Sequence, residues 1–280
     1  MAKTWRHTTS LSAEERLEVL DLMNRLESKL GREAIDEARR RIVVHGWPGE
    51  HWLRYVEGRL RDYTLVTGER DTTVEMVGGG FDDELLARLL AAHSCVDWWT
   101  RGPLASPLPR NEVLRMLQLL RVHLPVDVIR VPEGAILRNF ESDRDAPTWL
   151  RQNNAAFADH PEQGAWRLGD LTERTREPWF DPSGFLLLEI DGQLAASCWT
   201  KVHELHPDRF GEIYVISVDP AFQGRGLGRV MVTQGLEALR RKGVTHAVLF
   251  VDSSNESAKR LYESLGFTLQ REDHLLRFCA

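Results

Sequence analysis

Apolar residues recur along the chain with helical and strand-like periods, and the first 130 residues differ in pattern from the rest. In this first part, spacings of three and four predict helices over residues 12–30, 33–44, 82–93 and 111–121. The first helix opens with Ser12-Ala-Glu-Glu15, the arrangement of a capping box. Strands are predicted at 63–66 and 74–77. Pro132-Glu-Gly134 disfavours a helix, so we expect a boundary between domains of residues 1–132 and 133–280.

The second part alternates strands with helices more regularly. Strands are predicted at 135–140, 185–190, 194–202, 212–218 and 248–251. Helices are predicted over 147–157, from Gly228 to Gly243, and from a cap at Ser253/Ser254 to Gly266. Asp191-Gly192 joins two strands and is a strong hairpin signal. This order predicts the α/β class, with an α+β mixed sheet on which helices pack.

Length and charge limit the classes of function. A chain of 280 residues exceeds the roughly 100–150 residues of an ordinary domain, which favours two domains. The formal net charge of −6 argues against nucleic acid as a partner, since that needs a basic face. Apolar runs fall short of the roughly 18–20 residues that span a bilayer, and no secretory signal precedes Ser12, so we expect no membrane contact.

Cysteine and histidine usage suggests neither disulfides nor a metal. Cys95, Cys198 and Cys279 are scattered and form neither a disulfide framework nor a CxxC pair. We therefore expect a soluble, monomeric protein of a reducing cytoplasm, with Cys198 in the core. His203 and His206 have the spacing of metal ligands but lack a third ligand nearby, so we expect no metal.

The segment Gln223-Gly-Arg-Gly-Leu-Gly228 lies between a predicted strand and a predicted helix. Its glycines let backbone N–H groups approach a ligand closely, and the helix adds unsatisfied donors and the positive end of its dipole. This arrangement favours a phosphate ligand, whereas the alternative is a flexible turn. The spacing GxGxG does not fit a Rossmann loop, and neither a Walker sequence nor a GxSxG nucleophile elbow is present.

These six residues match Q/R-x-x-G-x-G/A, and in this the chain resembles the GCN5-related acetyltransferases. The resemblance runs from Ala135 to Phe278 and includes Ser254-Asn255-Glu-Ser-Ala258 and Leu261-Tyr-Glu-Ser-Leu-Gly-Phe267. It implies a tandem acetyltransferase fold with a degenerate N-terminal half, and acetyl-CoA as co-substrate. It also implies that the coenzyme contacts Ile216, Ser217, Val218, Gln223, Gly224, Arg225, Gly226, Leu227, Gly228, Arg229, Asn255, Ser257, Ala258 and Arg260.

Five further segments resemble the mycothiol synthases, which have two acetyltransferase-like halves. These segments are Asn153-Asn-Ala-Ala-Phe157, His160-Pro-Glu-Gln-Gly164, Trp179-Phe-Asp-Pro182, Trp199-Thr-Lys-Val-His203 and Gly211-Glu-Ile-Tyr-Val215. That family acetylates the cysteinyl amine of cysteinyl-glucosaminyl-inositol, so the resemblance implies a small-molecule amine as acceptor. The implied acceptor-binding residues are Glu162, Lys201, Glu212, Phe250 and Glu33, where Phe250 replaces the family's tyrosine.

Two residues are candidates for catalysis. Glu212 lies early in the strand that leads to the glycine loop and is expected to act as general base, although it could be an ordinary strand-edge carboxylate. Tyr262 is expected to protonate the departing thiolate, as the resemblance implies, but its position on an apolar helix face also fits a core residue. Glu162 and Lys201 could likewise be solvated surface charges.

The N-terminal half shows only Gly78-Gly-Gly80 before a helix and no Q/R-x-x-G-x-G sequence. We therefore expect it to form a wall of the acceptor site and to bind no pyrophosphate. Two other functions remain open: an acetyltransferase that uses another amine, and a protein that binds acetyl-CoA without turnover.

Overall fold

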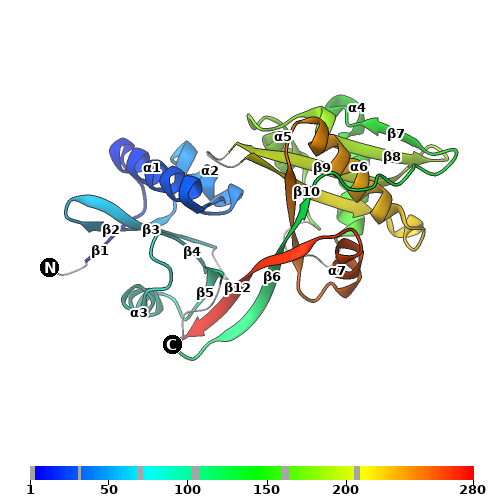
Figure 1. The fold of residues 1–280 in the computed structure, drawn as a ribbon. Coiled ribbons are helices and arrows are strands. Elements are labelled where there is room, and N and C mark those ends of the chain that lie inside the picture. The colour runs from blue at the N-terminus through cyan, green and yellow to red at the C-terminus, as the bar shows by residue number, and fades with distance from the viewer. Residues whose placement is uncertain are drawn as a thin grey trace.

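The computed structural model describes residues 4–30, 33–68, 72–102, 108–158, 160, 164–204 and 209–280. Figure 1 shows two lobes that are joined by long, curved strands. The elements of the N-terminal half are β1 (Trp5–Thr8), α1 (Ala13–Leu30), α2 (Glu37–His45), β2 (Glu50–Val56), β3 (Arg59–Thr67), β4 (Thr73–Val77), α3 (Asp83–Ala92), β5 (Cys95–Arg101) and β6 (Glu112–His123).

The C-terminal half repeats the mixture of helices and strands. Its elements are β7 (Ile136–Asn139), α4 (Ser142–Ala156), α5 (Leu168–Thr175), the short 3-10 helix η1 (Pro182–Gly184), β8 (Phe185–Ile190), β9 (Gln193–Glu204), β10 (Arg209–Val218), the 3-10 helix η2 (Pro220–Phe222), α6 (Leu227–Arg241), β11 (His246–Asp252), α7 (Glu256–Glu263) and β12 (Thr268–Cys279).

The strands form one continuous 12-stranded sheet in the order β1-β2-β3-β4-β5-β12-β6-β11-β10-β9-β8-β7. The last strand of the chain, β12, therefore lies between β5 and β6, and β6 lies between β12 and β11. Figure 1 shows β6 and β12 side by side across the junction of the lobes. The two halves thus share strands, and the division into residues 1–132 and 133–280 stays a prediction.

Several local predictions are confirmed. The Ser12 amide donates to Glu15 Oε2 over 2.8 Å and the Glu15 amide to Ser12 Oγ over 3.2 Å, which is the reciprocal capping box. Asp191 and Gly192 both have positive φ, at 52° and 73°, as a two-residue hairpin turn requires. The mixed sheet with helices packed on it is also as expected.

Other local predictions are wrong. The helix predicted over 111–121 is absent: residues 112–121 belong to β6, because β12 and β11 pair with this segment along both edges. The helix expected over 33–44 begins only at Glu37, and that expected at Pro147 begins at Ser142. The cap of α7 is Asn255, whose side chain accepts from the Ala258 amide over 3.0 Å, and not Ser253 or Ser254.

The expectation about the cysteines also needs correction. Cys95 and Cys279 face each other on β5 and β12 and are joined by a disulfide. They are 184 residues apart, so only the pairing of distant strands brings them together. Cysteine usage therefore no longer argues for a reducing compartment. Cys198 is free and buried, as expected.

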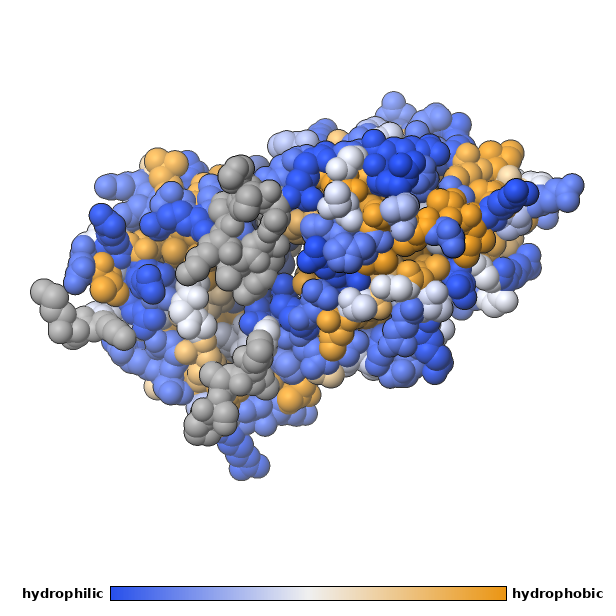
Figure 2. All heavy atoms as spheres, in the orientation of Figure 1, coloured by the Kyte–Doolittle hydropathy of each residue, from blue (hydrophilic) through white to orange (hydrophobic). Residues whose placement is uncertain are grey.

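Two hydrophobic clusters cover the faces of the C-terminal sheet. Met231, Leu236 and Leu239 of α6 pack on one face, where they are fully buried. Trp149 of α4 packs on the other face against Phe185 and Trp199. This packing sets the sheet, and with it β10, between two layers of helices. No helix in the described ranges has the length and apolar character to cross a bilayer. Figure 2 shows hydrophilic residues spread over both lobes of the face it presents.

Candidate active site

A cavity opens where two parallel strands of the C-terminal half separate. β10 pairs with β11 only at Gly211↔Ala247 and Glu212↔Val248, whereas its pairing with β9 continues to Val218↔Ala196. The register of β9 and β10 shifts between Ile213 and Val215, which indicates a bulge there. Residues 213–218 of β10 then line a cavity of about 660 Å³. One edge of β10 is thus left to pair with an extended ligand.

The glycine loop and the N-terminus of α6 form one end of this cavity. Gly224 and Gly226 have φ of +75° and +76°, a conformation that favours glycine. Among the described residues, no backbone carbonyl accepts from the amides of residues 224–228. Five amide donors at the start of a 15-residue helix suit a phosphate or diphosphate. The residues present therefore fit the diphosphate of coenzyme A.

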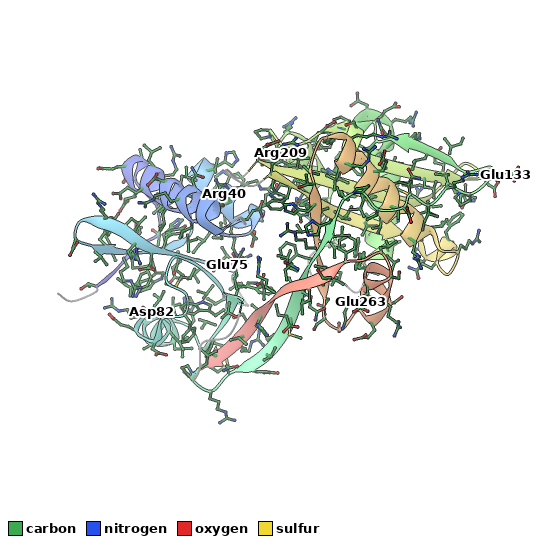
Figure 3. The ribbon with its side chains drawn as sticks, viewed as in Figure 1. Arg40, Glu75, Asp82, Glu133, Arg209 and Glu263 are labelled. Atoms are coloured by element: carbon green, nitrogen blue, oxygen red, sulfur yellow. A yellow bond between two sulfur atoms is a disulfide. The ribbon has the colours of Figure 1, made fainter. Side chains whose placement is uncertain are left out.

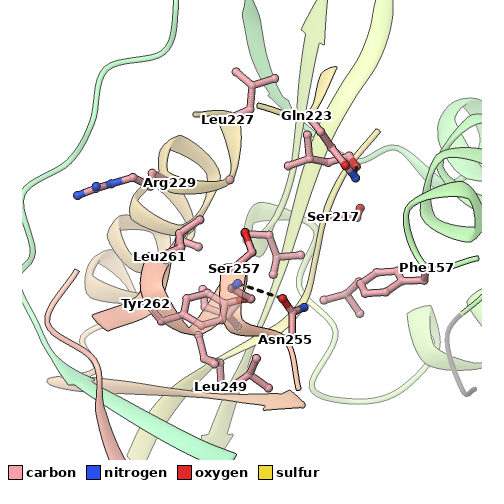
Figure 4. A pocket seen from close by; sticks show the side chains of 18 of the residues that line it. Phe157, Ser217, Gln223, Leu227, Arg229, Leu249, Asn255, Ser257, Leu261 and Tyr262 are labelled. Carbon is pink, nitrogen blue, oxygen red and sulfur yellow. Dashed lines mark hydrogen bonds between the residues drawn. The ribbon is translucent and has the colours of Figure 1, made fainter. Parts of the chain in front are cut away.

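Helix α7 forms the opposite wall. Figure 4 shows Leu261 and Tyr262 on one side of the cavity, with Ser217 and Phe157 on the other. Ser217 presents its main chain, because its hydroxyl bonds with Ser197 Oγ over 2.9 Å and with Gln152 Oε1 over 2.9 Å. The cavity is lined by these predicted coenzyme contacts: Ile216, Ser217, Val218, Gln223, Gly224, Gly226, Leu227, Gly228, Arg229, Asn255, Ser257 and Ala258.

Two predicted coenzyme contacts, Arg225 and Arg260, are not among the lining residues. The guanidinium of Arg225 lies 4.9 Å from the ring centroid of Phe222 in η2, and Arg260 is exposed on α7. Both stay predictions as coenzyme ligands. Each would have to reach the ligand from outside the cavity.

Tyr262 is a core residue that also faces the cavity. It is 7% exposed and packs against Phe267 with ring centroids 5.6 Å apart, so it belongs to the core. It also lines the cavity. Burial raises the pKa of its hydroxyl well above the ordinary value, and the group therefore stays protonated at neutral and mildly alkaline pH.

Glu212 lies at the closed end of the split between β10 and β11. It is 9% exposed, and the side chain of His203 lies 2.5 Å from it, measured from Nε2 to Oε2. The two residues that follow Glu212 on β10 line the cavity, while Glu212 itself is not among the lining residues. Its carboxylate is thus a neighbour of the cavity and is held by a hydrogen bond.

Lys201 connects the two halves of the chain. Its Nζ lies 2.8 Å from Glu33 Oε1 and 3.0 Å from Glu37 Oε2, and it stands over the rings of Trp179 and Tyr214 at 4.8 and 5.7 Å. Burial alone would lower the pKa of Lys201, but the charges of Glu33, Glu37 and Glu212 raise it above its ordinary value. Lys201 is therefore a buried cation and not a solvated surface charge.

Glu33 and Glu37 bring negative charge from the N-terminal half. Burial alone would raise the pKa of Glu33, yet the charges of Lys201 and His203 hold it below the ordinary value. Sequence reasoning proposed Glu33 but missed Glu37, although the spacing of four between two carboxylates was visible. Arg40 and Glu75 mark the side of the N-terminal lobe that faces this junction (Figure 3).

Of the other two predicted acceptor residues, Phe250 lines the cavity, and Glu162 lies in a part of the chain that the structure does not describe. Phe250 lines the cavity with 44% of its surface exposed, and the guanidinium of Arg271 lies 5.8 Å from its ring centroid. Glu162 lies outside the described residues, as does His206 of the possible metal pair. In the described ranges, no group of three or more His, Cys, Asp or Glu residues could hold a metal ion.

The corresponding loop of the N-terminal half is filled by the protein's own carboxylates. Asp62 Oδ1 accepts from the Gly79 amide over 2.6 Å, and Asp82 caps α3 by accepting from the Leu85 amide over 2.8 Å. Arg54 bonds to both carboxylates, over 2.7 Å to Asp62 and 2.5 Å to Asp82. Two negative charges at this helix start disfavour a pyrophosphate there.

Solved structures share the fold of this protein over nearly the whole chain. A tandem GNAT protein from the clavulanic acid biosynthesis pathway superposes with a TM-score of 0.69 at 16% identity, covering 99% of this chain and 98% of its own. A GCN5-related N-acetyltransferase from Sphaerobacter thermophilus gives 0.68 at 18% identity, covering 98% and 95%. At these identities the similarity shows the fold, and the expected tandem acetyltransferase fold is confirmed.

The split strands, glycine loop and helix start define an acyltransferase of the GNAT class, and the Acetyltransferase (GNAT) family matches residues 149–267. Members of that class use acetyl-CoA as co-substrate. More specifically, the chain belongs to the mycothiol acetyltransferase family. The mycothiol acetyltransferase of Streptomyces griseus is 37% identical over 279 residues, covering 92% of this chain and 90% of that protein.

Two further relatives have higher identity over shorter alignments. The mycothiol acetyltransferase of Thermobispora bispora is 42% identical, covering 84% of this chain and 74% of that protein. That of Thermomonospora curvata is 49% identical over 178 residues, which cover 61% of this chain and 59% of the relative. The expected resemblance to this family is confirmed.

Proposed function

We propose that this acyltransferase moves the acetyl group of acetyl-CoA to the cysteinyl amine of cysteinyl-glucosaminyl-inositol and so forms mycothiol. The observation that carries the proposal is the split between β10 and β11, which ends at Glu212 and opens toward the glycine loop. Membership of the mycothiol acetyltransferase family supports the acceptor, since the alignment covers 90% of the Streptomyces griseus protein of that name.

Coenzyme binding is supported by three walls of the cavity. The amides of residues 224–228 would hold the diphosphate, and the free edge of β10 would pair with the pantetheine arm. Asn255 starts α7 on the opposite wall. When bound, acetyl-CoA supplies an acyl thioester that an amine can attack.

Glu212 would accept a proton from the acceptor amine, either directly or through one water molecule. An α-amine has a pKa of about 7.7–8.0, so roughly a tenth of it is already neutral at pH 7. Deprotonation of the amine at pH 7 therefore costs only about 1–1.4 kcal/mol. Holding the amine in attack geometry can contribute more, about 7–11 kcal/mol. Position matters more than basicity for Glu212.

Tyr262 would protonate the departing thiolate. Its hydroxyl stays protonated because burial raises its pKa, and it lies on the cavity wall opposite β10. The acetyl group would then pass directly from the coenzyme to the amine, without an acetylated residue of the protein as an intermediate. Cys198, the free cysteine, is fully buried in the core, and burial raises the pKa of its thiol to about 12, so it makes a poor nucleophile.

The acceptor would lie at the junction of the two halves. Glu33, Glu37 and Glu212 give this region three carboxylates near the cation of Lys201, which suits a ligand that carries an ammonium group and hydroxyls. Phe250 on the cavity wall offers an apolar contact in place of a hydroxyl.

The test is acetyl transfer from acetyl-CoA to cysteinyl-glucosaminyl-inositol, compared with other amines. The acceptor carries its own thiol, so free coenzyme and product should be separated by chromatography and identified by mass. Glucosaminyl-inositol is the matched control, because it lacks only the cysteinyl group. We expect product only with the cysteinyl compound. Equal transfer to unrelated amines would indicate another acetyltransferase activity, and binding of acetyl-CoA without any product would indicate a non-catalytic protein.

A further inference from the structure

His203 of β9 lies between a carboxylate of each half of the chain. Its Nε2 lies 2.5 Å from Glu212 Oε2, and its Nδ1 lies 3.6 Å from Glu33 Oε1. Glu33 precedes α2 and belongs to the N-terminal half, whereas Glu212 is on β10 of the C-terminal half. The imidazole thus forms a bridge across the junction.

The orientation of this ring is restrained by packing. His203 is 6% exposed and stacks on Phe210, with centroids 4.6 Å apart and planes inclined by 14°. Phe210 stacks in turn on His246 at 5.7 Å. A ring held by stacking keeps its two nitrogens in fixed directions. The imidazole therefore faces Glu212 with Nε2 and Glu33 with Nδ1 in a defined orientation.

Charged groups surround His203 on each neighbouring element. Lys201 lies on its own strand and Glu212 on β10, while Glu33 and Glu37 come from the segment at the start of α2. Glu27 of α1 and Arg101 of β5 interact with the same cluster from farther away. Lys201 Nζ forms its hydrogen bonds with Glu33 and Glu37. Within the described ranges, the side-chain nitrogen that bonds to the carboxylate of Glu212 is Nε2 of His203.

We propose that His203 is a positioning residue, which fixes the carboxylate of Glu212 and couples it to Glu33 of the N-terminal half. This inference rests on the proposed role of Glu212 as general base. One carboxylate oxygen is held by the imidazole, and the other is left to face the acceptor amine. A base oriented by a third group is the usual requirement for productive proton transfer. The N-terminal half, whose loop at Gly79 is occupied by Asp62, thereby contributes to the assembly of the reactive site.

The test compares two substitutions of His203 with a matched histidine. His203→Gln keeps an N–H donor near the place of Nε2, whereas His203→Leu removes it. His246→Gln is the control, because it changes a histidine of the same ring stack and leaves the nitrogen of His203 that bonds to Glu212 in place. The rate of acetyl transfer is measured from pH 5 to pH 10 for each variant, together with the dissociation constant of acetyl-CoA.

For His203→Leu we expect kcat to fall by about 10- to 100-fold at pH 7, as misplaced catalytic groups do. The acid limb of the kcat/KM profile should move to higher pH, because a carboxylate that loses a hydrogen-bond donor is protonated more readily. His203→Gln should recover most of kcat. The affinity for acetyl-CoA should stay unchanged, and His246→Gln should keep most of kcat and the acid limb of the wild type, because Phe210 still stacks on His203.

The proposal is overturned if the wild type transfers acetyl and His203→Leu shows the same kcat and acid limb. It is also overturned if the Leu and Gln variants lose activity equally without any shift of the profile. A wild type without transfer would instead refute the proposed function. A measurement that does not depend on turnover is ¹⁵N NMR of the imidazoles. A hydrogen-bonded Nε2 proton on His203 that is lost in Glu212→Ala, which has no side-chain acceptor, supports the bridge, and its absence in the wild type refutes it.

Discussion

Glu212 on β10 lies directly opposite Val248 on β11, and theirs is the last pair that these two parallel strands form. Beyond it the chain of β10 lines the cavity, so the candidate base stands where the strands separate. Backbone pairing therefore sets the distance between Glu212 and any ligand that pairs with β10. This relationship links the architecture of the sheet to the chemistry of acetyl transfer.

Replacement of Glu212 by glutamine should lower the rate of acetyl transfer at pH 7 by about 100-fold, the effect typical of a lost general base. Much of the activity should return near pH 9, where an amine with a pKa of about 7.7–8.0 is mostly neutral. The measurement is the pH dependence of kcat/KM for the acceptor. Glu204→Gln is the control, because Glu204 is an exposed carboxylate on the paired strand. An equal deficit at both pH values would exclude the role of a base.

Replacement of Tyr262 by phenylalanine should lower kcat by at least about tenfold, since the thiolate would leave without a proton donor. The affinity for acetyl-CoA should change little, because the aromatic ring still packs against Phe267. The loss should persist from pH 7 to pH 9, as burial raises the pKa of this hydroxyl above that range. Single-turnover kinetics and a coenzyme titration separate the two effects. Unchanged turnover would leave Tyr262 as a core residue only.

Replacement of Gly226 by alanine should weaken binding of acetyl-CoA by at least about tenfold. Its φ of +76° is costly for a residue with a Cβ, and relaxation would move the amides at the start of α6. Gly192→Ala is a matched control, because Gly192 has a φ of +73° and, like Gly226, open space where a Cβ would stand. Both variants should lose about 1–2 kcal/mol of stability. Calorimetric titration should detect weaker coenzyme binding only for Gly226→Ala, and equal affinities would argue against a diphosphate at this loop.

Replacement of Glu33 by glutamine should lower the free energy of unfolding at pH 7 by about 1.5–3 kcal/mol, because the hydrogen bond to a charged Lys201 is weakened. The pKa of Glu33 is held below its ordinary value, so its contribution is complete above about 4.5 and is lost as the pH falls through the lower value in the folded protein. The difference between wild type and variant, measured by denaturant unfolding, should therefore shrink from pH 7 to pH 3.

The control for that substitution is Glu84→Gln on α3. Glu84 forms an exposed pair with Arg88, and such surface pairs contribute roughly 0–1 kcal/mol. We expect little change for this variant at either pH. A pH-independent difference for Glu33→Gln would mean that the carboxylate has no charged partner in the folded protein.

Local signals predicted the parts of the site that depend on short segments of chain. The glycine loop, the hairpin at Asp191 and the capping box at Ser12 each depend on residues within a few positions, and all three are present in the structure. The helix predicted over 111–121 was wrong, because this segment pairs with two neighbouring strands although its apolar spacing is helical. Local propensity is weak compared with the hydrogen bonds of a strand paired on both edges.

The sequence by itself determined the class of the fold and the glycine turn before α6, since turn geometry, helix starts and alternating patterns are encoded locally. The resemblance to the acetyltransferases added Glu212 and Tyr262 as candidates for catalysis, and these roles stay predictions. Tertiary structure alone decided the contacts that join distant positions. Lys201 meets Glu33 across 168 residues, Cys95 meets Cys279 across 184, and His203 reaches carboxylates of both halves. Such contacts follow from the order of strands in the sheet, which emerges only when the whole chain packs around its cores.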